Sequence, residues 1–144
     1  MLELRDLALA FAGRRVLDGL SLQVAAGETV ALLGPSGEGK SSLLAVIAGL
    51  LRPQRGQVWL GGRDISRLPP ERRQLAMMFQ DHALFPHLDA AANVAFGLQE
   101  RDVPRAAARQ RAEAALAAVG LAGRGAAACH QLSGGEQQRV ALAR

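Results

Sequence analysis

One glycine-rich segment carries the residue types that are needed to hold a phosphate group. Residues 34–41 read Gly-Pro-Ser-Gly-Glu-Gly-Lys-Ser and fit the pattern G-x-x-x-x-G-K-[ST] without a gap. Glycines let successive backbone N–H groups turn toward phosphate oxygens, and a helix that begins there adds the positive end of its dipole. Lys40 would place its charge on the terminal phosphates, and the Ser41 hydroxyl would bind Mg²⁺. The segment therefore predicts a phosphate-binding loop.

Two charged side chains of this loop have opposite effects on an anion. Lys40 is the only lysine among 17 basic residues, which fits a chain that uses arginine freely and keeps lysine where a compact charge is needed. Glu38 is unfavourable there, because a carboxylate that faces the loop would repel phosphate. We expect the Glu38 side chain to point outward.

A second segment, Leu132 to Arg144, also predicts an anion-binding helix start. Ser133 and Glu136 have the spacing of a capping box, which begins a helix. Gly134 and Gly135 in the first turn leave backbone N–H groups uncovered. One nucleotide could use both segments of one chain, or the segments could pair between two chains.

The elements that must position these segments follow from hydrophobic patterning. Residues 29–33 and 75–79 are short apolar runs typical of buried strands, and residues 41–51 predict a helix that is buried on most sides. After Pro86 the chain is rich in alanine and favours helices. The further expected elements are strands at 2–7 and 16–24, a hairpin at 57–65, a helical turn at 69–73 and helices at 89–98 and 104–119, the first capped by Asp89.

Composition narrows the class of protein. The 144 residues are 49% hydrophobic and 21% charged, as in an ordinary globular domain, with a net charge of +4. Aromatic residues make up only 3%, which argues against a base-stacking surface for nucleic acid. No apolar run is long enough to span a membrane, and no signal peptide is evident. The pair Arg72–Arg73 is expected to lie on a solvated edge. The residues His82, His87, Cys129 and His130 lack metal-ligand spacing.

The two motifs together resemble those of ATP-binding cassette (ABC) ATPases. Residues 132–144, LSGGEQQRVALAR, resemble the signature motif, GPSGEGKS resembles the Walker A loop, and Phe79-Gln80 resembles the Q-loop. The resemblance implies an α/β P-loop NTPase fold, with a β-rich amino-terminal part and nucleotide-binding core over 1–85 and a helical signature subdomain over 86–144. The LFPHL and NVAFGL segments are similar to importer subunits for polyamines, ferric iron, thiamine or sulfate.

The resemblance also implies roles for individual residues. ATP phosphates would be held by Gly34, Pro35, Ser36, Gly37, Glu38, Gly39, Lys40, Ser41 and Ser42. Ser41 and Gln80 would ligate Mg²⁺, and Phe11 would stack on adenine, with a core aromatic as the alternative. The terminal phosphate of a second cassette, in a head-to-tail dimer, would meet Ser133, Gly134, Gly135, Glu136 and Gln137.

The resemblance places such a subunit at the cytoplasmic face of the membrane, as a peripheral protein. The helical part and residues 80–88 would touch transmembrane permease subunits, and a substrate-binding protein would act indirectly. We expect no nucleic-acid partner.

The family's catalytic segment, an apolar strand followed by Asp-Glu, has no counterpart among the 144 residues. We therefore expect a cassette that is truncated after the signature motif and has no catalytic residues. Its strands 29–33 and 75–79 would lack the neighbouring strands with which they pair, and the chain alone would hydrolyse little ATP. By family it would be an ABC-type ATPase that drives import. The alternatives are a soluble ABC ATPase, or a non-hydrolysing ATP-binding fragment that acts with a full-length partner.

Overall fold

The computed structural model describes residues 1–144, which divide into two compact units, Met1–Met77 and Met78–Arg144. The boundary lies earlier than the expected one after residue 85. Leu84 packs against the core of the second unit, and the buried Asn93 side chain hydrogen-bonds the backbone of Phe85. These contacts place the segment with Gln80 in the helical unit and not in the β-rich one.

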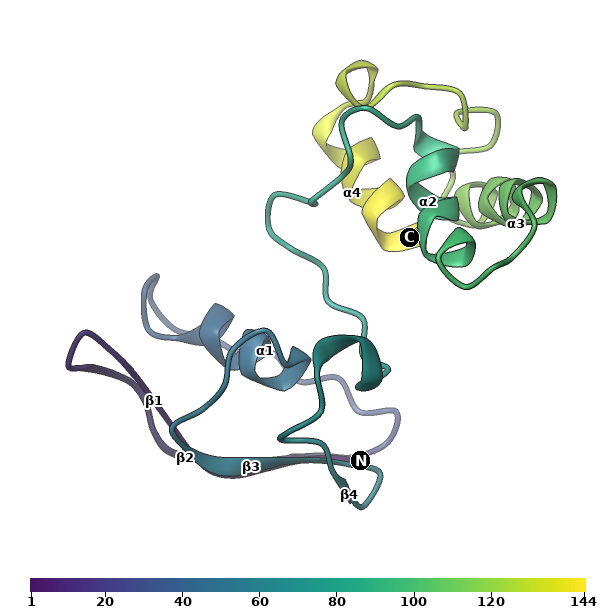
Figure 1. Cartoon of the computed structure of the whole chain (residues 1–144). Helices are drawn as coiled ribbons and strands as arrows, with labels where there is room; N and C mark the ends of the chain where they lie inside the picture. Colours follow the sequence, from purple (N-terminus) through teal and green to yellow (C-terminus); the bar gives the residue numbers. More distant parts are fainter. The chain divides into compact units, whose positions relative to one another are not determined.

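The first unit is built on an antiparallel sheet with the strand order β2-β1-β3-β4 (Figure 1). The strands are β1 (Leu2–Phe11), β2 (Arg14–Val24), β3 (Arg55–Leu60) and β4 (Arg63–Asp64). The turn between β1 and β2 is Ala12–Gly13, and both residues have positive φ, 46° and 82°. Such a turn matches the twist of the strands that it joins. The expected strands at 2–7 and 16–24 and the expected hairpin at 57–65 are therefore confirmed.

Helix α1 (Lys40–Ala48) packs its apolar residues with one face of this sheet (Figure 1). Leu43 and Val46 of α1 join a buried cluster that also contains Leu4, Leu7, Leu9, Leu17, Val58 and Ile65. The expectation that this helix is buried on most sides is met in part, because Leu43 and Val46 are buried whereas Ser41 and Leu44 are exposed, Leu44 by 46%. The helix face that carries Leu43 and Val46 is the one that packs against the sheet.

The apolar segments 29–33 and 75–79 form no strands in this structure. Neither segment pairs with a neighbouring strand, and a strand exists only where its backbone groups have partners in a ladder. The expected burial of the first segment was also wrong, because Leu33 is 92% exposed and Val30 is 40% exposed. The expected helical turn is confirmed as a 3-10 turn, η1 (Pro70–Arg72).

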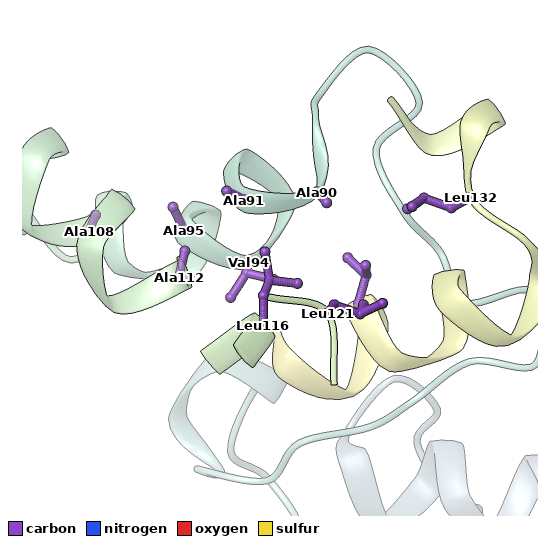
Figure 2. Packing of buried hydrophobic residues seen from close by; sticks show 10 residues of the cluster. Ala90, Ala91, Val94, Ala95, Ala108, Ala112, Leu116, Leu121 and Leu132 are labelled. Atoms are coloured by element: carbon purple, nitrogen blue, oxygen red, sulfur yellow. The ribbon is translucent and has the colours of Figure 1, made fainter. Parts of the chain in front are cut away.

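The second unit consists of the helices α2 (Ala90–Gln99), α3 (Arg105–Ala118) and α4 (Gly134–Ala143), with a 3-10 turn, η2 (Cys129–Gln131). Buried alanines from α2 and α3, including Ala95, Ala108 and Ala112, line the contact between these two helices, as Figure 2 shows. Small side chains let the two helices approach closely. Asp89 caps α2 by accepting from the Ala92 N–H at 2.7 Å, as predicted. No helix has the length and apolar character that a membrane crossing requires.

Candidate nucleotide-binding site

The loop that precedes α1 depends on glycine at defined positions. Gly37 and Gly39 have φ values of 85° and 86°, in the left-handed region. A Cβ on Gly39 would lie 2.6 Å from Val16 Cγ1 and 2.8 Å from the Val16 carbonyl oxygen. Because β2 leaves no room for a side chain there, residue 39 must be glycine for the loop to turn into α1.

Lys40 is folded over the loop that it follows. Its ammonium donates to the Gly34 carbonyl oxygen at 2.7 Å and to the Pro35 carbonyl oxygen. The loop residues from Gly34 to Glu38 are exposed, so their backbone is accessible to a ligand. A phosphate that entered the loop would offer the ammonium stronger, charged acceptors than these two carbonyls.

The Glu38 carboxylate does not point away from the loop as expected. Its Oε2 atom lies 3.2 Å from the position that a Cβ on Gly34 would take. The side chain therefore reaches back across the loop to its first residue. A negative charge at this place opposes the binding of a phosphate group.

The far end of α1 is held by a buried arginine, Arg73, which is 4% exposed. Its guanidinium donates to the carbonyl oxygens of Val46 (2.8 Å), Ile47 (2.9 Å), Leu68 (2.8 Å) and Ser66 (2.9 Å). Burial lowers the pKa of this guanidinium. The expectation of a solvated Arg72–Arg73 edge was wrong for Arg73, because the carboxyl end of a helix attracts a cation. Arg73 thus fixes the helix that carries the phosphate loop.

The start of α4 forms the predicted capping box. The Ser133 hydroxyl accepts from the Glu136 N–H at 3.3 Å, and Glu136 Oε2 accepts from the Ser133 N–H at 2.8 Å and from its hydroxyl at 2.9 Å. These hydrogen bonds, with the nearby Arg124 as a smaller cause, lower the pKa of the Glu136 carboxyl. Gly134 and Gly135 are exposed, and no other atom lies close to the face where a Cβ on Gly134 would stand.

Gln137, which was expected to meet a phosphate, also holds this helix start in place, and Asn93, which the sequence patterns did not single out, holds the backbone before α2. Gln137 donates to the carbonyl oxygens of Cys129 (2.9 Å) and Leu132 (3.2 Å). Asn93 is fully buried, and its side chain bonds the backbone of Phe85, Leu88 and Asp89. The available signal for Asn93 was its position between apolar residues in the first half of α2.

The two remaining predicted site residues, Gln80 and Phe11, are exposed. Gln80 is exposed and precedes a turn in which His82 and Ala83 have φ values of 61° and 46°. Phe11 ends β1 and is 47% exposed, so it is not a buried core aromatic. Phe11 and the phosphate loop belong to the first unit, whereas Gln80 and the signature residues belong to the second.

The oxygen donors suit a magnesium ion bound together with a nucleotide. The Ser41 hydroxyl is exposed in the first turn of α1 and makes no hydrogen bond within the chain. Mg²⁺ takes few protein oxygens and completes its shell with phosphate and water. No group of three or more His, Cys, Asp or Glu side chains is placed to bind a metal by itself.

A glycine-rich loop that leads into a helix, with lysine and serine at its end, defines a P-loop nucleotide-binding protein. The sequence profile described as ABC transporter matches residues 17–144. The chain therefore belongs to the ABC transporter family, as the two motifs predicted.

Relatives that match the whole chain include two importer subunits of different substrate class. The Fe(3+) ions import ATP-binding protein FbpC of Streptomyces avermitilis is 51% identical, and the chain covers 42% of it. The spermidine/putrescine import ATP-binding protein PotA of Marinobacter nauticus is 47% identical, and the chain covers 39% of it. The chain thus spans about two fifths of the length of the relatives that it matches.

A solved structure confirms the fold class. The ATP-binding cassette MJ0796, in a dimeric post-hydrolysis state bound to ADP and Pi, matches with a TM-score of 0.85 and 31% identity. The match covers 99% of this chain and 68% of the solved one. The expected ABC cassette fold is therefore confirmed for this chain.

Proposed function

We propose that the chain forms the ATP-binding part of an ABC importer subunit, which couples ATP binding and hydrolysis to the import of a small solute. The geometry of residues 34–41 carries this proposal, because an exposed loop with two left-handed glycines leads directly into α1. The printed names of the relatives, which concern import of ferric ions and of polyamines, support the importer class. The substrate would belong to a polyamine, ferric iron, thiamine or sulfate-like class.

The bound nucleotide would be ATP with Mg²⁺. In this proposal the Lys40 ammonium leaves the Gly34 and Pro35 carbonyl oxygens and binds the terminal phosphates instead. Ser41 and Gln80 would supply oxygen ligands to the metal, and the exposed Phe11 ring would stack on adenine. The ion itself would neutralise phosphate charge.

The signature residues would serve a second cassette. Gly134 and Gly135, in the segment from Ser133 to Gln137, leave their backbone N–H groups uncovered at the start of α4, which suits the terminal phosphate of a nucleotide held by another subunit in a head-to-tail dimer. Permease subunits would bind the helical unit and residues 80–88, with a substrate-binding protein acting indirectly. The protein would then lie peripherally on the cytoplasmic face of the membrane.

A binding measurement with a single-residue variant tests the proposal. The purified chain is titrated with a fluorescent ATP analogue in the presence of Mg²⁺, as parent, as Lys40→Ala and as Arg14→Ala. Arg14 is an exposed cation of the same unit without an ion pair. Loss of the charged hydrogen bonds in Lys40→Ala should weaken binding roughly tenfold or more. Equal affinity of parent and Lys40→Ala, or an equal loss in both variants, would contradict the proposal.

A further inference from the structure

Two adjoining hollows in the first unit are lined by arginine and by no acidic residue. One, of about 290 Å³, is lined by residues 52–56 together with Ser66 and Arg67. The other, of about 400 Å³, is lined by Gly49, Leu51, Arg52, Ser66, Arg67, Leu68, Pro69, Pro70 and Arg73. Arg52, Ser66 and Arg67 line both hollows, which therefore adjoin, and the pair is called the arginine depression below. No residue of the phosphate loop lines either hollow.

Two guanidinium groups of the arginine depression form no ion pair. Arg52 and Arg67 are exposed, and neither forms an ion pair within 4.0 Å. Arg55 is paired with Asp6 at 2.9 Å. Arg73 is buried and hydrogen-bonded only to backbone carbonyl oxygens, so its position is fixed, and Asp64 acts on its charge without forming an ion pair within 4.0 Å.

Asp64, an acidic group close enough to Arg67 to interact with its charge, is already engaged. Asp64 Oδ1 accepts from the Ser66 N–H at 2.8 Å and from the Ser66 hydroxyl at 2.5 Å. These two hydrogen bonds are the main reason that the pKa of Asp64 is lowered, and the charge of Arg67 is a smaller one. The Ser66 hydroxyl also accepts from the Val58 N–H at 2.8 Å. Asp64 is thus held toward Ser66, and the arginine side of the depression keeps an excess of positive charge.

Guanidinium groups favour phosphate, because their planar fork can donate two parallel hydrogen bonds to one phosphate group. The volumes of the two hollows, about 290 and about 400 Å³, each lie near the lower end of the range for small-molecule sites. We propose that the arginine depression binds a phosphate-bearing anion through Arg52 and Arg67, with Arg73 as a fixed charge beneath it. The phosphate could belong to a soluble phosphate compound or to a lipid headgroup. This site is separate from the phosphate loop and does not depend on the proposed import function.

Residue-resolved NMR separates this site from the phosphate loop. The isotopically labelled chain is titrated with inorganic phosphate, with pyrophosphate, and with vesicles of phosphatidylcholine with or without phosphatidylglycerol. We expect saturable shifts of the backbone signals of Arg52, Gly56 and Arg67, independent of the shifts of residues 34–41. The double variant Arg52→Gln/Arg67→Gln should weaken the binding reported by Gly56 roughly tenfold or more. The control Arg14→Gln/Arg63→Gln removes the same charge from exposed, unpaired arginines outside the depression.

Each result decides the proposal in one direction. Saturation by phosphate or pyrophosphate that only the Arg52/Arg67 variant loses supports the site with a soluble ligand. A response confined to vesicles that contain phosphatidylglycerol, again lost only in that variant, supports a headgroup. Shifts that do not saturate with any probe, or an equal loss in the control variant, would show general attraction to a basic surface and overturn the proposal.

Discussion

Replacing Arg73 by methionine should destabilise the first unit strongly while leaving the apolar stem of the side chain in place. Arg73 donates four hydrogen bonds, two to the last carbonyls of α1 (Val46 and Ile47) and two to the loop that contains Ser66 and Leu68. All four donor–acceptor distances lie between 2.8 and 2.9 Å. Methionine keeps much of the packing and removes every donor.

The size of the effect follows from these contacts. A hydrogen bond from a charged group contributes about 1.5–3 kcal/mol, so four such bonds would give roughly 6–12 kcal/mol before desolvation is counted. Burial of the guanidinium costs several kcal/mol, and water can reach some of the carbonyls that the variant leaves free. We therefore expect a net loss of about 3–5 kcal/mol, a large part of the 5–15 kcal/mol that is typical for a folded domain.

Urea unfolding followed by circular dichroism measures this loss, with Arg72→Met as the matched control. Arg72 is exposed, and its side chain makes no hydrogen bond or ion pair, so its replacement should change the free energy of unfolding by less than about 0.5 kcal/mol. Equal midpoints for the two variants would refute the role assigned to Arg73.

A second substitution tests the geometry around Arg73. Gly49 has a φ of 87°, and a Cβ on it would lie 2.5 Å from Arg73 Nε. Gly49→Ala should therefore cost more in the parent than in an Arg73→Ala background, where the Arg73 atoms that the Cβ would meet are absent and only the backbone strain of about 1–2 kcal/mol remains. Identical costs in the two backgrounds would mean that the close approach of Gly49 and Arg73 has no energetic effect.

Three further predictions concern the phosphate loop and the second unit. Glu38→Ser should tighten binding of Mg-ATP several-fold in the fluorescence titration, because the carboxylate lies against Gly34; unchanged affinity would place its charge outside the reach of the phosphates. Asn93→Leu should lower the free energy of unfolding by about 2–4 kcal/mol in urea, since four bonds to buried backbone are lost, and an effect no larger than that of Gln99→Leu would contradict this. Glu136 has a pKa below its ordinary value of 4.5, so its stabilisation of α4 should be complete above that pH and disappear as the pH falls through the lowered pKa. Unfolding midpoints of the parent and of Glu136→Gln should converge in acid, and parallel pH profiles would exclude this role.

Much of the candidate site was predictable because its interactions are short in sequence. The capping box joins Ser133 to a residue only three positions away, and the phosphate loop is continuous with the first turn of α1. Asp89 likewise caps a helix through the N–H of Ala92. Local patterns of this kind fix the backbone that they contain, so their chemistry could be read from residue types and spacing.

Interactions between distant segments were not predictable in the same way. Arg73 is separated from Val46 by 27 positions, and nothing local distinguishes it from its exposed neighbour Arg72. The apolar run at 29–33 has the composition of a buried strand, yet it forms no ladder, because pairing requires a second strand and not only a suitable sequence.

Residue types and spacing were enough to identify the phosphate loop, the helix start at Ser133 and membership of the ABC transporter family, because ordered motifs and local capping carry that information. Three features became visible only in the folded chain: Arg73 is buried against the end of α1, Glu38 turns back to Gly34, and Arg52 and Arg67 line the same two hollows. Each of these features depends on where the folded chain brings backbone and charge together, since burial and electrostatic attraction depend on distance in space and not on distance along the sequence.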